Sequence, residues 1–202
     1  MTPEFVDEYL RSFSACLAEI PRQTVTAVGE CLLDAFDRSA WVFLAGNGGS
    51  AALASHFACD LEKTTAGRRP REVDRRFRVQ ALADNLASLT AWSNDEGYEH
   101  VFAESLRSRA SERDVLIVIS ASGNSPNIVA ALEQARRMGV RTVGWLGFDG
   151  GRAKAMCDHA LHVRSHDYGV VEAAHGVFTH LITDWLRQQF ELPARHDLRE
   201  VG

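Results

Sequence analysis

The first forty residues carry hydrophobic side chains at the spacing of amphipathic helices. Thr2 and Pro3 match a helix N-cap followed by proline at the first helical position. Apolar residues then recur every three or four positions, and Pro21 divides them into two runs. The pattern therefore predicts two helices over about residues 1–38, ahead of the first strand.

From residue 41 onward, short continuous apolar runs alternate with segments of helical spacing. The strand-like runs are Trp41–Ala45, Val79–Ala83, Val115–Ile119, Arg141–Leu146 and Ala160–Val163. Helical segments follow the first and third runs, and a longer one extends from about Val170 to Gln189. Continuous apolar runs are typical of strands that are buried on both faces of a parallel sheet. We therefore expect an α/β three-layer sandwich with a five-stranded parallel sheet, folded as one domain over residues 1–190 and followed by a tail at 191–202.

Composition agrees with a single globular domain and narrows the choice of partners. The 202 residues are 46% hydrophobic and 24% charged, which is enough apolar material for a substantial core. The formal net charge of −5 disfavours a dedicated nucleic-acid-binding protein. It does not exclude small anionic ligands, because backbone N–H groups bind anions without lysine or arginine.

Neither cysteine usage nor hydropathy suggests an oxidising compartment or a membrane. The four cysteines are widely spaced and form no CxxC pair, so neither a redox dithiol nor a cysteine-rich zinc site is indicated. The first residues do not resemble a signal peptide, and no apolar stretch is long enough to span a bilayer. These observations predict a cytoplasmic protein without membrane contact.

Two loops rich in glycine and serine follow predicted strands. Residues 46–50 read Gly-Asn-Gly-Gly-Ser, and residues 120–125 read Ser-Ala-Ser-Gly-Asn-Ser. Open α/β sheets bind ligands at the carboxyl ends of their strands, and hydroxyl groups beside a helix N-terminus suit a phosphate. Each loop taken alone also fits a turn with a helix cap. Both lack the GK[ST] and GxGxxG signatures, so no nucleotide cofactor is expected.

The segment from Glu62 to Arg78 is locally basic in this acidic chain, with seven lysine or arginine residues against three acids. A solvated loop is its simplest interpretation. The alternative is a loop that faces an anionic substrate or another subunit.

The stretches GNGGSAALASHFACDL and ISASGNSPNIVAAL, each placed after a strand, resemble the sugar isomerase (SIS) domain family. The resemblance covers about residues 7–189 and is strongest to members that isomerise phosphorylated heptoses. It implies an aldose–ketose isomerase that works through an enediol intermediate, with sedoheptulose 7-phosphate as the expected substrate and D-glycero-D-manno-heptose 7-phosphate as the product. It also implies a homotetramer with active sites between subunits.

The same resemblance assigns substrate-binding roles. The phosphate would be held by the serines of the two loops, Ser50, Ser120, Ser122 and Ser125. The sugar would be lined by Asn47, Gly48, Asp84 and Glu172. Asp84 is equally consistent with turn and cap chemistry.

The resemblance further implies that Asp60 and His180 are the proton-transfer pair. The candidate ligands of a divalent metal, with zinc the expected ion, are His56, Asp60, Glu172 and His180. His56 and Asp60 are four residues apart, so they share one helix face. Glu172 and His180 are eight apart, roughly 12 Å along an ideal helix, so one ion reaches both only if their side chains converge, the helix starts late or two subunits contribute.

Two of these positions depart from the family pattern. Asp60 stands where the family has glutamate, and Glu172 stands where it has glutamine. The shorter acid places its carboxylate differently, and proton transfer tolerates little displacement. The alternatives are therefore a non-catalytic member of the family, either a sugar-phosphate sensor or a factor that binds the replication initiator, and an isomerase of a different sugar phosphate.

Overall fold

A computed structural model describes residues 1–66 and 75–190. The helices and strands, in chain order, are α1 (Pro3–Ala18), α2 (Arg22–Asp37), β1 (Trp41–Gly46), α3 (Gly49–Cys59), the π-helical turn η1 (Asp60–Thr64), β2 (Arg78–Ala81), α4 (Leu86–Glu96), the 3₁₀ turn η3 (Tyr98–His100), α5 (Val101–Arg107), β3 (Val115–Ser120), α6 (Pro126–Met138), β4 (Arg141–Leu146), α7 (Gly151–Lys154), β5 (His159–His162) and α8 (Tyr168–Gln189). The predicted tail lies outside the described residues.

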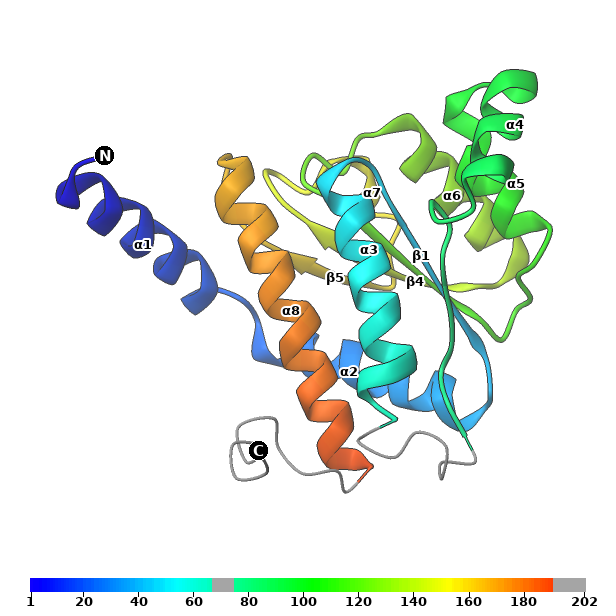
Figure 1. Cartoon of the computed structure of the whole chain (residues 1–202), viewed down its shortest axis with the longest axis horizontal. Helices are drawn as coiled ribbons and strands as arrows, with labels where there is room; N and C mark the ends of the chain where they lie inside the picture. The colour runs from blue at the N-terminus through cyan, green and yellow to red at the C-terminus, as the bar shows by residue number, and fades with distance from the viewer. Residues whose placement is uncertain (67–74, 191–202) are drawn as a thin grey trace.

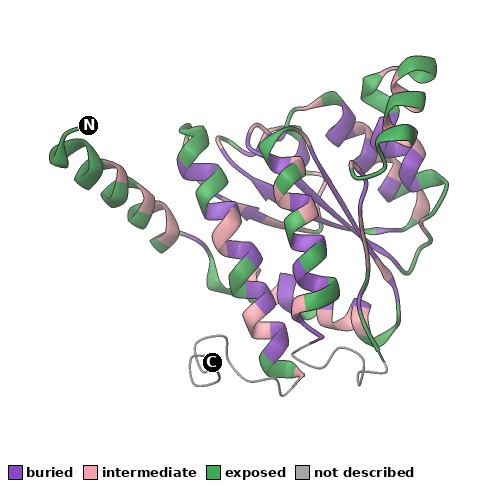
Figure 2. Ribbon diagram, viewed as in Figure 1, coloured by how far each residue is buried: buried purple, intermediate pink, exposed green. Residues whose placement is uncertain are grey.

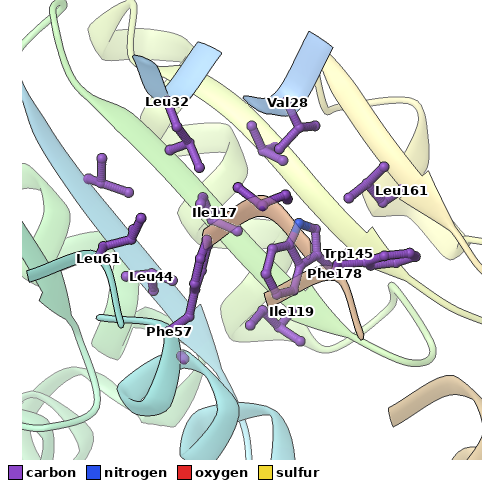
Figure 3. Packing of buried hydrophobic residues seen from close by; sticks show 14 of the residues in the cluster. Val28, Leu32, Leu44, Phe57, Leu61, Ile117, Ile119, Trp145, Leu161 and Phe178 are labelled. Atoms are coloured by element: carbon purple, nitrogen blue, oxygen red, sulfur yellow. The ribbon is translucent and has the colours of Figure 1, made fainter. Parts of the chain in front are cut away.

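Five strands of the described chain form one parallel sheet in the order β2-β1-β3-β4-β5. Alternate residues of each strand face opposite sides, so Leu44 and Ile117 enter one core while Phe43 and Leu116 enter another. The first core packs against α2, α3 and α8, as Figure 3 shows for its larger side chains. The second core packs against α5, α6 and α7. This arrangement confirms the predicted three-layer α/β fold (Figure 1).

The two predicted N-terminal helices are present, and the first one leaves the body of the domain. Thr2 caps α1 by accepting a 3.3 Å hydrogen bond from the Phe5 N–H, with Pro3 at the first helical position. Helix α1 has no buried residue and projects outward in Figures 1 and 2. No helix in the described residues is both long enough and apolar enough to cross a membrane.

Helices α4 and α5 were not predicted from the hydrophobic pattern, and their burial explains why. Helix α4 has no buried residue, whereas five of the seven residues of α5 are buried. Only Leu89 and Trp92 of α4 pack against the core, so neither helix shows the long one-sided apolar stripe on which recognition from sequence depends. The edge strands β2 and β5 are also displaced, by one or two residues, toward the N-terminus from their expected bounds.

The described part of the basic segment contacts its own chain, away from the glycine loops. Arg75 forms a 3.5 Å ion pair with Asp37, at the end of α2. Arg78 lies over the Trp41 ring and donates to the Ser39 carbonyl, at the amino ends of the strands. These contacts do not support a substrate-facing role for the two arginines. Residues 67–74 lie outside the described residues.

Candidate active site

The two glycine- and serine-rich loops meet at the carboxyl edge of the sheet. Strands β1 and β3 are neighbours, with Gly46 beside Ile119 in the register. The Asn47 and Asn127 side chains exchange two hydrogen bonds of 2.9 and 2.8 Å across the gap between the loops. Because Asn127 is buried and lies 80 residues from Asn47, this amide pair joins the two loops firmly.

Backbone crowding explains the glycines at two positions. A Cβ on Gly46 would lie 2.5 Å from the Ser50 carbonyl oxygen, so a side chain would push α3 away from β1. Gly123 has φ +62°, and its Cβ would lie 2.1 Å from the Gly150 carbonyl oxygen. Only glycine allows the backbone to approach this closely, which brings the helix N-termini to the sheet edge.

The four predicted phosphate-binding serines occupy this edge. Ser50 is in the first turn of α3, and Ser125 is the N-cap of α6, where its side chain makes no capping hydrogen bond. The Ser120 and Ser122 hydroxyl oxygens accept the N–H groups of residues 123 and 124 at 3.1 and 3.2 Å. This use of the oxygen still allows each O–H to donate to a phosphate oxygen, beside the positive ends of two helix dipoles.

A cavity of about 320 Å³ opens between α3 and α8. It is lined by Gly49, Ser50, Ala52, Leu53, His56, Glu172 and His175. The Glu172 carboxylate lies at the start of α3, with both oxygens 3.2 Å from the point where residue 49 would carry a Cβ. The volume suits a small ligand, and polar groups from both helices converge on it.

His56, Asp60 and His180 form a compact cluster farther along the same two helices. The Asp60 Oδ2 lies 3.5 Å from the His56 Nε2 and 3.5 Å from the His180 Nδ1. The imidazoles are edge to face with centroids 5.2 Å apart, and both are about half exposed while Asp60 is buried. The aspartate, although one methylene shorter than glutamate, thus reaches between both rings.

The cluster brings together three of the four predicted metal ligands. One donor atom from each of His56, Asp60 and His180 lies within 4.8 Å of the others. Glu172 is outside this group, two helical turns before His180, with its carboxylate at Gly49 instead. The structure thus groups three of the four predicted ligands, and the part of Glu172 as a fourth ligand stays a prediction.

His175 differs from the two histidines of the cluster. It is fully buried, with its ring 6.5 Å from the Trp145 ring and 6.1 Å from the Phe178 ring. Loss of solvation lowers the pKa of His175 to about 4, against a smaller raising effect from the Leu146 backbone. It therefore stays neutral near pH 7, buried at the inner wall of the cavity.

The remaining residues near the edge show what sequence reasoning found and missed. Asp84 lies at the predicted edge, but its carboxylate accepts a hydrogen bond from the Ser55 hydroxyl, and Asn85 caps α4 instead. Sequence reasoning missed Asn127 and Tyr98, whose hydroxyl donates to the Asn47 Oδ1 at 2.9 Å. A polar residue directly after the proline that starts α6 was the available signal for Asn127.

The chain matches known proteins in sequence over most of its length. Residues 4–147 match the model of the SIS domain family. The phosphoheptose isomerase of Trichlorobacter lovleyi is 36% identical over 190 residues, covering 91% of this chain and 90% of that protein. The phosphoheptose isomerase of Mycobacterium tuberculosis is 36% identical over 171 residues, covering 85% of each chain.

Solved structures agree with these relatives. The phosphoheptose isomerase of Neisseria gonorrhoeae superposes with a TM-score of 0.82 at 27% identity, covering 92% of this chain and 97% of that one. The phosphoheptose isomerase of Francisella tularensis superposes with a TM-score of 0.83 at 26% identity, covering 93% and 100%. The similarity therefore extends through both loops and the helices that carry the cluster.

Proposed function

The chain belongs to the SIS domain family and is related to its phosphoheptose isomerases. On this premise we propose that it is an aldose–ketose isomerase that converts sedoheptulose 7-phosphate into D-glycero-D-manno-heptose 7-phosphate. The observation that carries the proposal is the Asp60 carboxylate, held 3.5 Å from two imidazoles at one end of a site whose other end is a phosphate-binding edge.

Substrate binding begins with the phosphate in this proposal. Ser50, Ser120, Ser122 and Ser125 bind its oxygens, together with the N–H groups at the starts of α3 and α6. Asn47, Gly48, Asp84 and Glu172 line the sugar at the same edge. Because none of these groups is lysine or arginine, the site accepts an anion in a protein whose net charge is −5.

Asp60 and His180 then transfer the protons. Asp60 takes the proton from the carbon beside the carbonyl while His180 protonates the carbonyl oxygen, which produces the enediol. His180 next removes the proton from the other hydroxyl, and Asp60 returns its proton to the former carbonyl carbon. Each group ends in its starting protonation state, so the pair is ready for another turnover.

The cluster also fits a divalent cation, with zinc the expected ion. Two imidazoles and one carboxylate, whose donor atoms lie within 4.8 Å, are a donor set that zinc accepts with a fourth position open. When bound by His56, Asp60 and His180, such an ion would polarise the sugar oxygens.

Solvent exchange is the direct test of the proposed activity. Incubating the protein in deuterated water with sedoheptulose 7-phosphate should replace the hydrogen beside the carbonyl with deuterium, as followed by NMR. Fructose 6-phosphate and ribulose 5-phosphate serve as alternative substrates, and each reaction is repeated with a chelator. Exchange that the chelator abolishes and zinc restores would support the metal site. Absence of exchange with every sugar phosphate would contradict the enzyme and favour a sugar-phosphate sensor.

We infer in addition that the protein is a homotetramer built through its N-terminal helices. Phe5, Val6 and Leu10 are exposed on α1. An apolar groove of about 440 Å³ lies between α2 and α8, and Leu181, the residue after His180 on α8, is among those that line it. A second copy seated there would cover apolar surface on both chains.

Disrupting this surface should change the mass in solution. Phe5→Asp together with Leu10→Asp is expected to convert tetramers into smaller species in light scattering coupled to gel filtration, because each change places a charge in an apolar contact. Ser12→Asp, an exposed polar position on the same helix, is the matched control. A wild-type protein that elutes as a monomer, or a double variant that stays tetrameric, would contradict the inference.

We also place the protein in the cytoplasm. Its four cysteines carry free thiols. Burial raises the pKa of Cys157 to about 12, so this thiol stays protonated and unreactive at neutral pH. Free thiols of this kind are typical of a reducing compartment.

A further inference from the structure

Helix α8 runs beside α3 and its continuation η1, in the same direction (Figure 1). Three successive contacts along their length join α8 to this neighbour. The first contact is between Glu172 and Gly49, and the second is between His180 and Asp60. The third lies four residues farther along η1 and seven farther along α8, where the Arg187 Nη1 donates a 2.7 Å hydrogen bond to the Thr64 carbonyl oxygen. The catalytic cluster thus lies between two other contacts of the same helix pair.

The helix changes its geometry at the cluster. Beginning at Asp60, α3 continues as the π-helical turn η1, in which the Thr65 N–H bonds to the Asp60 carbonyl at 3.1 Å. Wide turns of this kind are uncommon and occur frequently at functional sites. Here the turn begins at the residue to which we assign proton abstraction.

Within this turn, Thr64 holds the carboxylate of Asp60. The Thr64 hydroxyl donates a 2.8 Å hydrogen bond to the Asp60 Oδ1. The two imidazoles approach the other oxygen, Oδ2. Since one oxygen is held by the hydroxyl, the plane of the carboxylate is set and Oδ2 is directed toward His56 and His180.

We propose that Thr64 is a positioning residue for the isomerase reaction, in which its hydroxyl orients the Asp60 carboxylate and its carbonyl, bonded to Arg187, ties the π turn to α8. This inference rests on the proposed function. The Arg187 guanidinium is buried, so its bond to the Thr64 carbonyl is shielded from water. Thr64 does not contact the phosphate-binding edge and acts only through Asp60.

Replacing Thr64 with valine, which has nearly the same shape but lacks the hydroxyl, is the test. We expect kcat to fall about 10- to 100-fold, the range typical of lost partners of active-site groups, while KM is unchanged because the phosphate is held elsewhere. Thr64→Ser keeps the hydroxyl and should restore most of kcat. Thermal melting of each variant shows that it is folded, and Thr64→Ala replaces the valine variant if that one does not fold.

Thr65→Val is the matched control from the same turn. The Thr65 hydroxyl donates to the Leu61 carbonyl at 2.5 Å and does not bond to the Asp60 carboxylate, so its removal should change the melting temperature but not kcat. A Thr64→Val enzyme with wild-type kcat, or equal losses of kcat at both positions, would overturn the inference. Failure of the proposed function is distinct, because the wild-type protein would then exchange no solvent deuterium into any sugar phosphate.

Discussion

Replacement of His180 with alanine is expected to abolish isomerisation while leaving sugar-phosphate binding intact. The His180 Nδ1 lies 3.5 Å from the Asp60 Oδ2, and the ring is half exposed on α8. Its removal deletes one of the two groups proposed to transfer protons, a change that costs about 10²- to 10⁴-fold in rate for general acid–base catalysis. The serines and helix N-termini proposed to hold the phosphate are on other elements, so ground-state affinity should persist.

Two measurements on the same variant separate these effects. Turnover of sedoheptulose 7-phosphate reports the loss of rate, and calorimetric titration with the same sugar phosphate reports the retained affinity. His159→Ala is the matched control, because His159 lies at the start of β5, at the opposite edge of the sheet. Wild-type turnover in the His180→Ala protein would refute the assigned mechanism.

Replacement of Asp60 with asparagine should produce a loss of similar size. Asparagine preserves the shape of the side chain and an oxygen that accepts the hydrogen bond from the Thr64 hydroxyl. It cannot take up the proton from the reacting carbon. We expect kcat to fall about 10²- to 10⁴-fold, with deuterium exchange into the substrate lost to the same extent.

The matched variant is Asp60→Glu, which carries the residue usual in the family. The surroundings are arranged for the shorter acid, with the two imidazoles at 3.5 Å and the Thr64 hydroxyl at 2.8 Å. An added methylene displaces the carboxylate by more than 1 Å, so we expect an intermediate activity, reduced about 100-fold. If Asp60→Asn retains wild-type exchange, Asp60 is not the base, whatever the outcome with glutamate.

Much of the fold could be predicted because its signals are local. The buried runs around β1, β3 and β4 are continuous in sequence, and the cap at Thr2 depends on neighbouring residues only. The phosphate loops were recognisable for the same reason, since each glycine and serine acts within a few residues of a strand end. Helices α4 and α5 were missed because one has no fully buried residue and the other is buried almost throughout.

The candidate site was predictable in its members but not in its arrangement. Spacing along one helix places His56 and Asp60 on a shared face, and the family resemblance adds His180 and Glu172. Spacing does not reveal that the Glu172 carboxylate lies at Gly49, outside the cluster. Nor does it reveal the π turn that begins at Asp60, because a single turn of five residues is too short to set a hydrophobic period of its own.

The sequence by itself therefore determined the fold class, the five strands along the chain and the chemistry available at the strand ends, because these depend on short-range periodicity and residue type. Only the tertiary structure decided which groups act together. The Asn47–Asn127 pair spans 80 residues, and the Thr64–Arg187 bond spans 123. Such contacts form only when packed helices bring distant side chains to within hydrogen-bond distance, which is why the two loops and the cluster of His56, Asp60 and His180 could be located only in the folded chain.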